Sequence, residues 1–355
     1  MSIRKTPFGR LPQGHEVTLY TMVNAHGASV SMIDYGAIVT SILVPDRNGK
    51  MGDVCLGFDR LDAYLAGHGS MGDTIGRYGN RICKGLLTVD QTTYQLACND
   101  HGINHLHGGN EGFNRKIWDV KTVEEEHRDA LVFHVISPDG DENYPGTLDV
   151  TVTYSWDDDC NLGIRYQACT DETTVCNMTN HAYFNLAGHD SGDIRTHRVR
   201  IESDLVTAVN AELIPTGDYF PVAGTPLQLD GSFTLGEGLD RISECQSMQF
   251  AGGYDHNFVL RKGSAMGLAA CVEEEKTGRH MLVFTDQPGV QLYTACTTHL
   301  EGAKGGHVYG HFCGLCLETQ HYPDSPNHPN FPSTLLRPGE VYDTSTIYSF
   351  RTMKA

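Results

Sequence analysis

Short runs of β-branched, aromatic and other apolar residues recur along almost the whole chain of 355 residues, with turn residues between them. Runs of this kind predict β-strands, and few segments show the long 3.6-residue apolar period of an amphipathic helix. We therefore predict an all-β fold, a large antiparallel β-sandwich. The predicted strands cover residues 17–23, 29–33, 37–44, 53–58, 86–89, 92–96, 117–123, 130–137, 148–156, 161–170, 199–201, 257–260, 268–274, 281–285 and 290–295, with a strand pair in 339–350.

A single domain spanning residues 1–355 is expected, because the sequence has no internal repeat, no low-complexity segment and no composition break that would mark a linker. Residues 45–50 contain Asn48-Gly49 and predict a hairpin turn. Residues 59–65 predict one or two helical turns. Two long irregular stretches, 67–81 and 98–115, are candidates for functional loops, since long loops without secondary structure usually serve a function.

The chain carries 44 acidic and 26 basic residues, a formal net charge of −18. Such a surface repels nucleic acid and anionic lipid, so we expect neither nucleic acid nor membrane as a partner. We expect no signal peptide and no membrane span, because no apolar run has the required length. The eleven cysteines are scattered and odd in number, which indicates reduced thiols and a cytoplasmic protein. Cys313 and Cys316 have redox spacing but lie in a strand-like run, and we interpret them as packing residues.

Residues 180–188, NHAYFNLAG, combine a proton-transfer side chain with amides and aromatic rings. His181 can exchange a proton near neutral pH. Tyr183 and Phe184 offer flat apolar faces, and the asparagines offer donors and acceptors. This mixture suits a polar, ring-shaped ligand such as a sugar. A strand with a core histidine and packed aromatic rings is the competing interpretation of the stretch taken alone.

Other polar residues lie in glycine-rich or apolar surroundings. Asn80 and Arg81 together offer an amide and a fork of donors suited to sugar hydroxyls. Asp255 can accept hydrogen bonds from two neighbouring hydroxyls. Glu318 follows the apolar run 315–317, where a buried carboxylate is costly unless it is paired or functional, and burial raises its pKa. A general base and a structural partner for an arginine are both consistent with this position.

His105, His107 and Glu111 form the pattern H-x-H-x3-E, which resembles the metal motif of the cupins, another β family. In a strand the two histidines would share one face. A cupin also needs a later histidine close behind a proline-glycine turn, and after residues 288–289 the next histidine is His299. We therefore predict no metal site, with metal binding held as the alternative.

Six motifs occur in order along the chain: N-R-I at 80–82, L-H-G-G at 106–109, N-H-x-Y-F-N-L-x-G at 180–188, Y-D-H-N-F at 254–258, P-G-V-Q-x-Y-T at 288–294 and E-T-Q-x-Y-P-D at 318–324. As a set, they resemble the aldose 1-epimerases, also called galactose mutarotases, over essentially the whole chain. The resemblance implies a galactose mutarotase-like supersandwich and an enzyme that interconverts the α and β anomers of a free aldohexose such as galactose or glucose, without a cofactor.

The resemblance also implies a role for each site residue. Glu318 would take the proton from the anomeric hydroxyl, His181 would protonate the ring oxygen, and His107 would hold that oxygen. Substrate-binding roles fall to the residues that would position or line the sugar: Asn80, Arg81, Tyr183, Asp255 and Gln291. Ring opening moves one proton at O1 and one at O5, so two positioned groups suffice and neither nicotinamide nor metal is needed.

Two departures from the family pattern carry expectations of their own. Ala182, where the family often has threonine, should point away from the face of its two neighbours. Tyr78-Gly79 predicts an altered pocket rim. Three other functions stay open: a non-catalytic sugar-binding module, a cupin-type metalloenzyme and an epimerase for hexose 6-phosphate. The acidic balance disfavours the phosphate ester, and the oligomeric state is expected to be monomer or homodimer.

Overall fold

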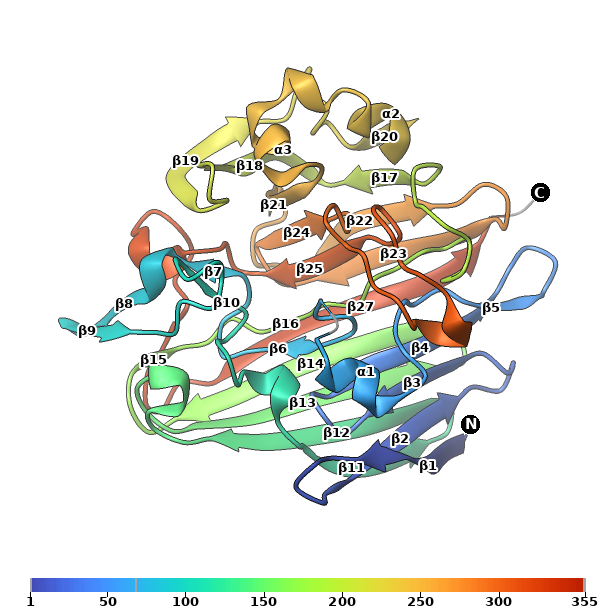
Figure 1. Cartoon of the computed structure of the whole chain (residues 1–355), viewed down its shortest axis with the longest axis horizontal. Coiled ribbons are helices and arrows are strands. Elements are labelled where there is room, and N and C mark those ends of the chain that lie inside the picture. The colour runs from blue at the N-terminus through green and yellow to red at the C-terminus, as the bar shows by residue number, and fades with distance from the viewer. Residues whose placement is uncertain (1, 68, 354–355) are drawn as a thin grey trace.

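The computed structural model describes residues 2–67 and 69–353, and these residues form layered β-sheets (Figure 1). The strand pairs of the three main sheets are antiparallel, which confirms the predicted all-β class. Met1, His68 and residues 354–355, which the predicted domain 1–355 includes, lie outside the described residues. No helix within the described ranges is long and apolar enough to cross a membrane.

The large sheet contains nine strands of the described chain in the order β11-β12-β13-β14-β27-β23-β22-β17-β20. Alternate residues face the core, as Val150, Val152 and Tyr154 do in β13, and their neighbours face outward. The strands are β11 Asp119–Glu125, β12 Arg128–Ser137, β13 Leu148–Asp157, β14 Asn161–Thr170, β27 Tyr342–Thr352, β23 Arg279–Thr285, β22 Gly267–Glu273, β17 Arg198–Ile201 and β20 Asp230–Thr234.

Two smaller sheets of five described strands each complete the main layers. The N-terminal sheet is a meander of consecutive strands: β1 Ser2–Arg10, β2 Glu16–Val23, β3 Ser29–Ile33, β4 Ile38–Pro45 and β5 Met51–Asp53. The site sheet has the order β19-β18-β21-β24-β25, with bounds β19 Pro215–Pro221, β18 Ser203–Val209, β21 Asp255–Leu260, β24 Gly289–Tyr293 and β25 Cys316–Gln320.

The remaining elements are short. Two-stranded pairs join β6 Thr74–Ile75 with β16 Thr179–Asn180, β7 Arg81–Ile82 with β10 His105–Leu106, β8 Leu86–Val89 with β9 Thr92–Gln95, and β15 Thr174–Val175 with β26 Leu335–Leu336. The α-helices are α1 Leu61–Leu65, α2 Leu235–Leu239 and α3 Gln246–Ala251. The 3₁₀ turns are η1 Cys83–Gly85, η2 Phe113–Arg115, η3 Asp141–Asn143, η4 Ile242–Glu244, η5 Lys304–Gly306 and η6 Ser325–Asn327.

One continuous core joins the large sheet to both smaller sheets. It includes Trp156 and Phe350 from the large sheet, Val30 from the N-terminal sheet and Val290 from the site sheet, all buried. Burial of apolar surface on this scale is the dominant stabilising contribution to such a fold. The three sheets therefore share one hydrophobic interior, as a sandwich requires.

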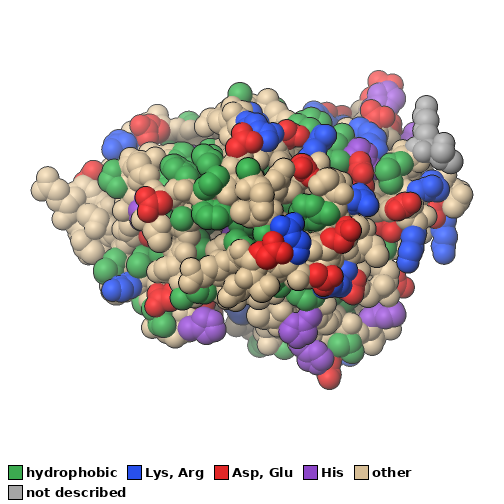
Figure 2. All heavy atoms as spheres, turned by 90° about the horizontal axis from the view of Figure 1, so that it is seen from above, with side chains coloured by type: hydrophobic (Ala, Val, Ile, Leu, Met, Phe, Trp, Pro, Cys, Tyr) green, Lys and Arg blue, Asp and Glu red, His purple; other side chains and the backbone are tan. Residues whose placement is uncertain are grey.

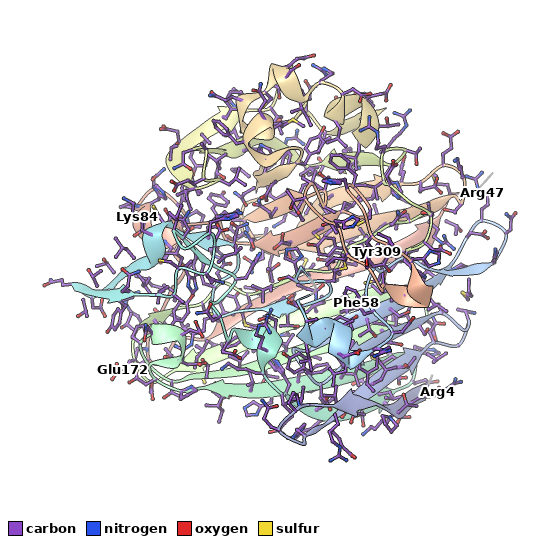
Figure 3. All side chains as sticks on the ribbon, viewed as in Figure 1. Arg4, Arg47, Phe58, Lys84, Glu172 and Tyr309 are labelled. Carbon is purple, nitrogen blue, oxygen red and sulfur yellow. The ribbon has the colours of Figure 1, made fainter. Side chains whose placement is uncertain are left out.

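A second cluster packs between the N-terminal sheet and the segment before β25. Phe58 and Tyr309, far apart in sequence, lie with their ring centroids 6.5 Å apart in it (Figure 3). Tyr183 and Cys316 belong to the same cluster. This packing supports the wall of the pocket described below.

On the face of the molecule seen in Figure 2, acidic and basic side chains are mixed.

Two of the predicted strands differ from the structure. The strand predicted over 53–58 ends at Asp53, because the Asp53 carboxylate accepts the backbone N–H groups of Ile42 and Cys55 and so replaces the strand ladder there. The strand pair predicted in 339–350 is the single strand β27, which pairs with β14 and β23 on its two sides and needs no hairpin partner. The predicted helical segment at 59–65 is confirmed as α1.

Candidate active site

A pocket of about 580 Å³ opens over one face of the site sheet. Strand ends and loops from distant parts of the chain surround it. Its lining residues are Gly69, Ser70, Asn80, Arg81, Asp100, His101, Leu106, His107, His181, Tyr183, Ala211, Glu212, Leu213, Phe250, Ala251, Asp255, Tyr293, Thr297, Thr298, His299, Leu300 and Glu318.

The register of the site sheet explains how Glu318 reaches the pocket. Side chains alternate along β25, so Leu317 and Thr319 face the interior of the sandwich and Glu318 faces the other way. Glu318 pairs with Gln291 of β24, which in turn pairs with Asn257 of β21. The pairing therefore sets a row of polar side chains across this face of the sheet.

Glu318 is 2 % exposed, and its Oε2 atom has no hydrogen-bond partner among the described residues. Burial raises the pKa of this carboxyl well above its usual range; the charge of Asp255 adds to the rise and that of Arg81 opposes it. A buried carboxylate oxygen without a partner is costly, so it is ready to accept a proton or a hydrogen bond from a ligand.

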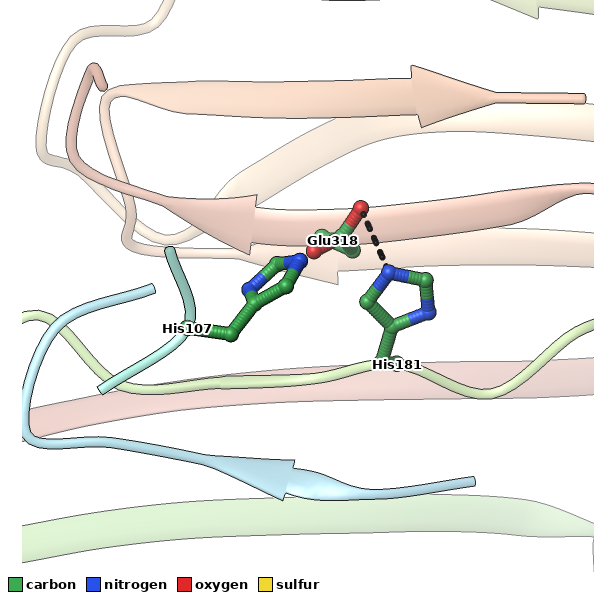
Figure 4. Close-up of side chains that lie close together, drawn as sticks. All are labelled: His107, His181 and Glu318. Atoms are coloured by element: carbon green, nitrogen blue, oxygen red, sulfur yellow. Dashed lines mark ion pairs between the residues drawn. The ribbon is translucent and has the colours of Figure 1, made fainter. Parts of the chain in front are cut away.

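His181 lies directly beside Glu318. The backbone of His181, just after β16, donates to the Asp73 carbonyl and accepts from Gly72, which fixes its position. Its Nε2 lies 3.5 Å from Glu318 Oε1 (Figure 4). Its Nδ1 lies 3.4 Å from the Sγ of Cys316. Two proton-transfer groups thus share one buried corner of the pocket.

His107 projects into the same corner from a tight turn. Its backbone is left-handed, with φ +52°, and a Cβ on the following Gly108 would lie 2.0 Å from the Gly76 carbonyl oxygen. Its Nδ1 accepts the backbone N–H of Asn80 at 3.2 Å, so the hydrogen of the neutral ring is on Nε2. Burial lowers the pKa of His107 well below its usual value, with help from His181 and Arg81. His107 is therefore a neutral donor.

Arg81, at the start of β7, is held by two carboxylates. Its Nε donates to Asp100 Oδ2 at 2.8 Å, and its Nη1 lies 3.6 Å from Asp255 Oδ2. Burial alone would lower the pKa of Arg81, but Asp255 and Asp100 raise it above its ordinary value. Gln291 donates from Nε2 to Asp255 Oδ1 at 2.6 Å and lies behind the lining residues, so its direct partner is Asp255.

Asn80 and Tyr183 complete the predicted set at the pocket wall. The Oδ1 of Asn80 accepts the backbone N–H of Arg81 at 2.8 Å. The Tyr183 hydroxyl donates to the Gly69 carbonyl at 2.7 Å, and its ring lies 5.1 Å from that of His181. All eight residues predicted for the site thus lie in or directly behind one pocket.

Three expectations about neighbouring residues need comment. His105 and His107 do not share a face, because the left-handed turn at His107 ends the strand and His105 bonds Tyr144 and Ala97 instead. The prediction that the two histidines share a face, as in a cupin-type metal site, is therefore wrong.

Tyr78 is fully buried in a separate cluster and does not line the pocket, so the prediction that it alters the pocket rim is also wrong. Ala182 packs in the main core, away from Tyr183, as expected.

The asparagines of the 180–188 stretch are structural. Asn180 donates to the carbonyls of Gly72 and Asp73, and Asn185 donates to those of Gly192 and Cys313. Burial raises the pKa of both Cys313 and Cys316, which fits their interpretation as unreactive packing thiols.

His107, His181 and Glu318 place one ligand atom each within 4.8 Å of one another, a spacing that could hold a metal. The hydrogen bonding at His107 disfavours this use. A metal-ligating nitrogen must carry no hydrogen, and the ring usually donates from its other nitrogen to a nearby acceptor. In this protein the other nitrogen is itself the acceptor, so Nε2 of His107 bears the hydrogen and serves as a donor.

Sequence reasoning missed several pocket residues. Asp100, the closer carboxylate partner of Arg81, lies in the loop 98–115 without any local signal of its role. Tyr293 lies in the P-G-V-Q-x-Y-T motif, and its ring stands 6.0 Å from Tyr183 and 6.3 Å from His181. The alternation of β24 could have indicated Tyr293, since it shares a face with Gln291.

Comparison with known proteins identifies the family to which this fold belongs. The family model for aldose 1-epimerase matches residues 18–349. The galactose mutarotase of Sus scrofa is 40% identical over 353 residues, 99% of each chain, and the aldose 1-epimerase of Escherichia coli (strain K12) is 35% identical over 342 residues, 96% of each. The crystal structure of the GalM/aldose epimerase homologue from C. elegans superposes with a TM-score of 0.85 at 28% identity, covering 94% of this chain and 98% of that one.

The fold and its pocket define a β-sandwich enzyme that acts on carbohydrates. The chain belongs to the aldose 1-epimerase family. The predicted supersandwich and the predicted epimerase activity are confirmed by the same matches.

Proposed function

We propose that the pocket binds a free aldohexose such as galactose or glucose and interconverts its α and β anomers, with Glu318 as the base and His181 as the acid. The observation that carries the proposal is the 3.5 Å separation of His181 Nε2 and Glu318 Oε1 inside a pocket lined by hydrogen-bonding side chains. General acid and base groups must lie within reach of one substrate, and these two do.

The reaction needs only proton transfer. Glu318 takes the proton from O1, the C1–O5 bond breaks with its electrons passing to O5, and His181 delivers a proton to O5. The free aldehyde rotates about C1–C2 and closes on the other face, with both proton transfers reversed. Burial raises the pKa of Glu318, which makes its carboxylate a stronger base towards the weakly acidic anomeric hydroxyl.

His107 assists at the ring oxygen. Its Nε2–H is a fixed neutral donor because Nδ1 accepts the Asn80 N–H. When the ring bond breaks, negative charge grows on O5, and a donor already aimed at that charge stabilises the transition state more than the ground state. The lowered pKa of His107 keeps it from competing with His181 as the proton source.

Arg81, Asp255 and Asn80 are assigned to the remaining hydroxyls, with Tyr183 forming part of the wall. Arg81 and Asp255 together present donors and acceptors side by side, 3.6 Å apart, as vicinal hydroxyls require. Gln291 contributes by holding Asp255 at 2.6 Å. In this proposal Gln291 positions a sugar-binding residue.

A free sugar fits better than a phosphate ester. The guanidinium of Arg81 is already balanced by Asp100 and Asp255, and Glu212 adds another carboxylate to the lining. These carboxylates would repel a phosphate dianion in the pocket, and the described lining residues include no unpaired arginine or lysine to offset that repulsion. The printed names of the relatives, galactose mutarotase and aldose 1-epimerase, agree with a free aldose.

Polarimetry on freshly dissolved α-aldoses tests the function. Enzyme should accelerate the decay of optical rotation for α-D-galactose or α-D-glucose, and galactose 6-phosphate should compete poorly. A protein that binds the sugars but leaves the decay rate unchanged would instead be a non-catalytic binding module. The oligomeric state, monomer or homodimer, and the cytoplasmic location stay predictions.

A further inference from the structure

Outside the pocket, three side chains of metal-binding type meet on the outer face of the large sheet. Cys271 and Glu273 come from β22, on either side of the core residue Val272, so both point outward. His280 of β23 pairs with Glu273 across the strand ladder. Cys271, Glu273 and His280 each offer a ligand atom, and these atoms lie within 4.8 Å of one another.

The separations approach those of a tetrahedral zinc site. Cys271 Sγ lies 2.9 Å from His280 Nε2 and 3.9 Å from Glu273 Oε1, and the nitrogen and oxygen are 4.0 Å apart. Tetrahedral zinc, with bonds of about 2.3 Å to sulfur and 2.0–2.2 Å to nitrogen or oxygen, separates its donors by roughly 3.4–3.6 Å. Small rotations of two partly exposed side chains, Glu273 and His280, suffice to reach that geometry.

The surroundings tolerate a dication. The three residues line a cavity of about 290 Å³ together with Arg198, Arg200 and Asp230, which leaves room for water. Arg200 is already paired with Glu202, with Nε and Oε1 3.1 Å apart. A thiolate and a carboxylate would neutralise the two charges of the metal, so the bound group is neutral. It is one charge unit more positive than the free thiol and carboxylate, and Asp230 lies in the same cavity to offset that unit beside the arginines.

We propose that Cys271, Glu273 and His280 bind a zinc ion, with water from the adjoining cavity as the fourth ligand. Binding forms the Zn–S bond and releases the thiol proton to solvent, while the imidazole and the carboxylate bind without losing a proton. Thiolate and imidazole favour zinc over magnesium or calcium. The site shares no residue with the sugar pocket and does not depend on the proposed function.

Removing the thiol proton opposes zinc binding, whereas the imidazole needs no deprotonation. Burial raises the pKa of Cys271 to about 12, with the charge of Glu273 adding to the rise, so the metal has to displace the thiol proton. Burial lowers the pKa of His280, which leaves its ring neutral and able to bind. Because three protein ligands leave one position to water, the site resembles open zinc sites more than closed structural ones.

Cobalt(II) titration of the full-length, metal-free protein tests the proposal, because a thiolate bound to cobalt produces a charge-transfer absorption band that oxygen and nitrogen ligands do not. We expect the band to saturate at one cobalt per chain and to disappear when zinc is added. Cys271→Ser should abolish the band, and Glu273→Gln, at a half-exposed position, should weaken cobalt binding about tenfold or more through the loss of a charged ligand. Cys169→Ser, an exposed cysteine elsewhere, should leave the band unchanged.

Sugar epimerisation should proceed at the same rate in Cys271→Ser as in the unaltered protein, which also shows that the variant folds. Absence of a thiolate band in the unaltered protein would overturn the proposal, as would a band that persists in Cys271→Ser. Cobalt binding without a thiolate band but with loss of activity would assign the metal to His107, His181 and Glu318 and would likewise overturn it.

Discussion

Nε2 of His181 lies 3.5 Å from Oε1 of Glu318, and both side chains are almost fully buried. An acid and a base that are buried at this distance influence each other's proton affinity. One proton shared between them can be passed to O5 of a sugar while another is taken from O1. The proposed chemistry therefore depends on this contact more than on any other in the pocket.

Replacing Glu318 with glutamine should lower kcat/KM for α-D-galactose by about 10²–10⁴, because the amide keeps the shape of the carboxylate but cannot accept the O1 proton. Polarimetric rates at neutral pH measure the change. Glu126→Gln, at an exposed position in the turn between β11 and β12, is the matched control and should retain full activity. Unaltered activity in Glu318→Gln would contradict the assignment of the base.

Asp255→Asn should move the acid limb of the kcat/KM profile to lower pH. Activity requires ionised Glu318, so it rises as pH passes upward through the Glu318 pKa, which burial first and Asp255 second hold above its usual value. Removing the Asp255 charge lowers that pKa and shifts the limb with it. The unaltered enzyme should show a bell-shaped profile whose alkaline limb reports His181.

The position of the limb, and not the level of activity, is the readout, because Asp255 is also assigned to the substrate. Asp240→Asn, which removes an exposed carboxylate, should leave the limb in place. If the limb of Asp255→Asn coincides with that of the unaltered enzyme, a group other than Glu318 titrates there.

His107→Phe should lower kcat by about 10² with a smaller effect on KM, since a donor that acts on developing charge contributes mainly in the transition state. Phenylalanine keeps the ring but removes the Nε2–H group. Rates over a range of galactose concentrations separate the two parameters. The exposed His26→Phe serves as control. A rise in KM alone would show that His107 only binds the sugar.

The sequence was sufficient to predict the all-β class and eight residues that meet at the pocket, for a physical reason. In β25 a carboxylate interrupts an apolar run, and strand alternation then forces Glu318 to the face opposite Leu317. The cost of burying that carboxylate already indicates a special role. The six motifs predicted the other site residues, because together they specify one family.

The missed features depend on tertiary contacts or backbone turns. The sequence pattern predicts that His105 and His107 share one face of a strand. The left-handed backbone at His107 instead turns the His107 ring into the pocket. β1 was not predicted, because as an edge strand it exposes most of its side chains and lacks a clear apolar pattern. The pairing of Arg81 with Asp100 joins two loops and has no local signal.

Removal of metal should leave activity intact. Dialysis against EDTA is expected to change neither kcat nor KM, because His107 presents a hydrogen on Nε2 and ring opening requires only proton transfer. Elemental analysis before and after dialysis gives the metal content. Activity lost on dialysis and restored by a divalent metal would contradict this prediction and favour a metalloenzyme.

Lys304 should contribute strongly to stability. Its ammonium group is buried and donates to Asp53 Oδ2 and to the Cys55 carbonyl, both at 2.7 Å, so it ties η5 to the end of the N-terminal sheet. Lys304→Ala leaves the Asp53 carboxylate without its ion-pair partner and should lower the free energy of unfolding by about 3–5 kcal/mol. Urea denaturation followed by circular dichroism measures the loss, with the exposed Lys50→Ala as control.

A second variant separates charge from packing at this position. Lys304→Met keeps most of the side-chain volume but removes the ammonium group, so it should restore only the packing part of the loss. Lys304→Met and Asp53→Asn combined should be less destabilising than the sum of the two single changes, because the double variant leaves no unpaired charge. If Lys304→Ala and Lys50→Ala instead lose equal stability, the buried pair contributes no more than a surface lysine. The anchoring of η5 then has to come from the backbone N–H groups of Lys304 and Gly305, which donate to the Gly57 carbonyl and to the Asp59 carboxylate.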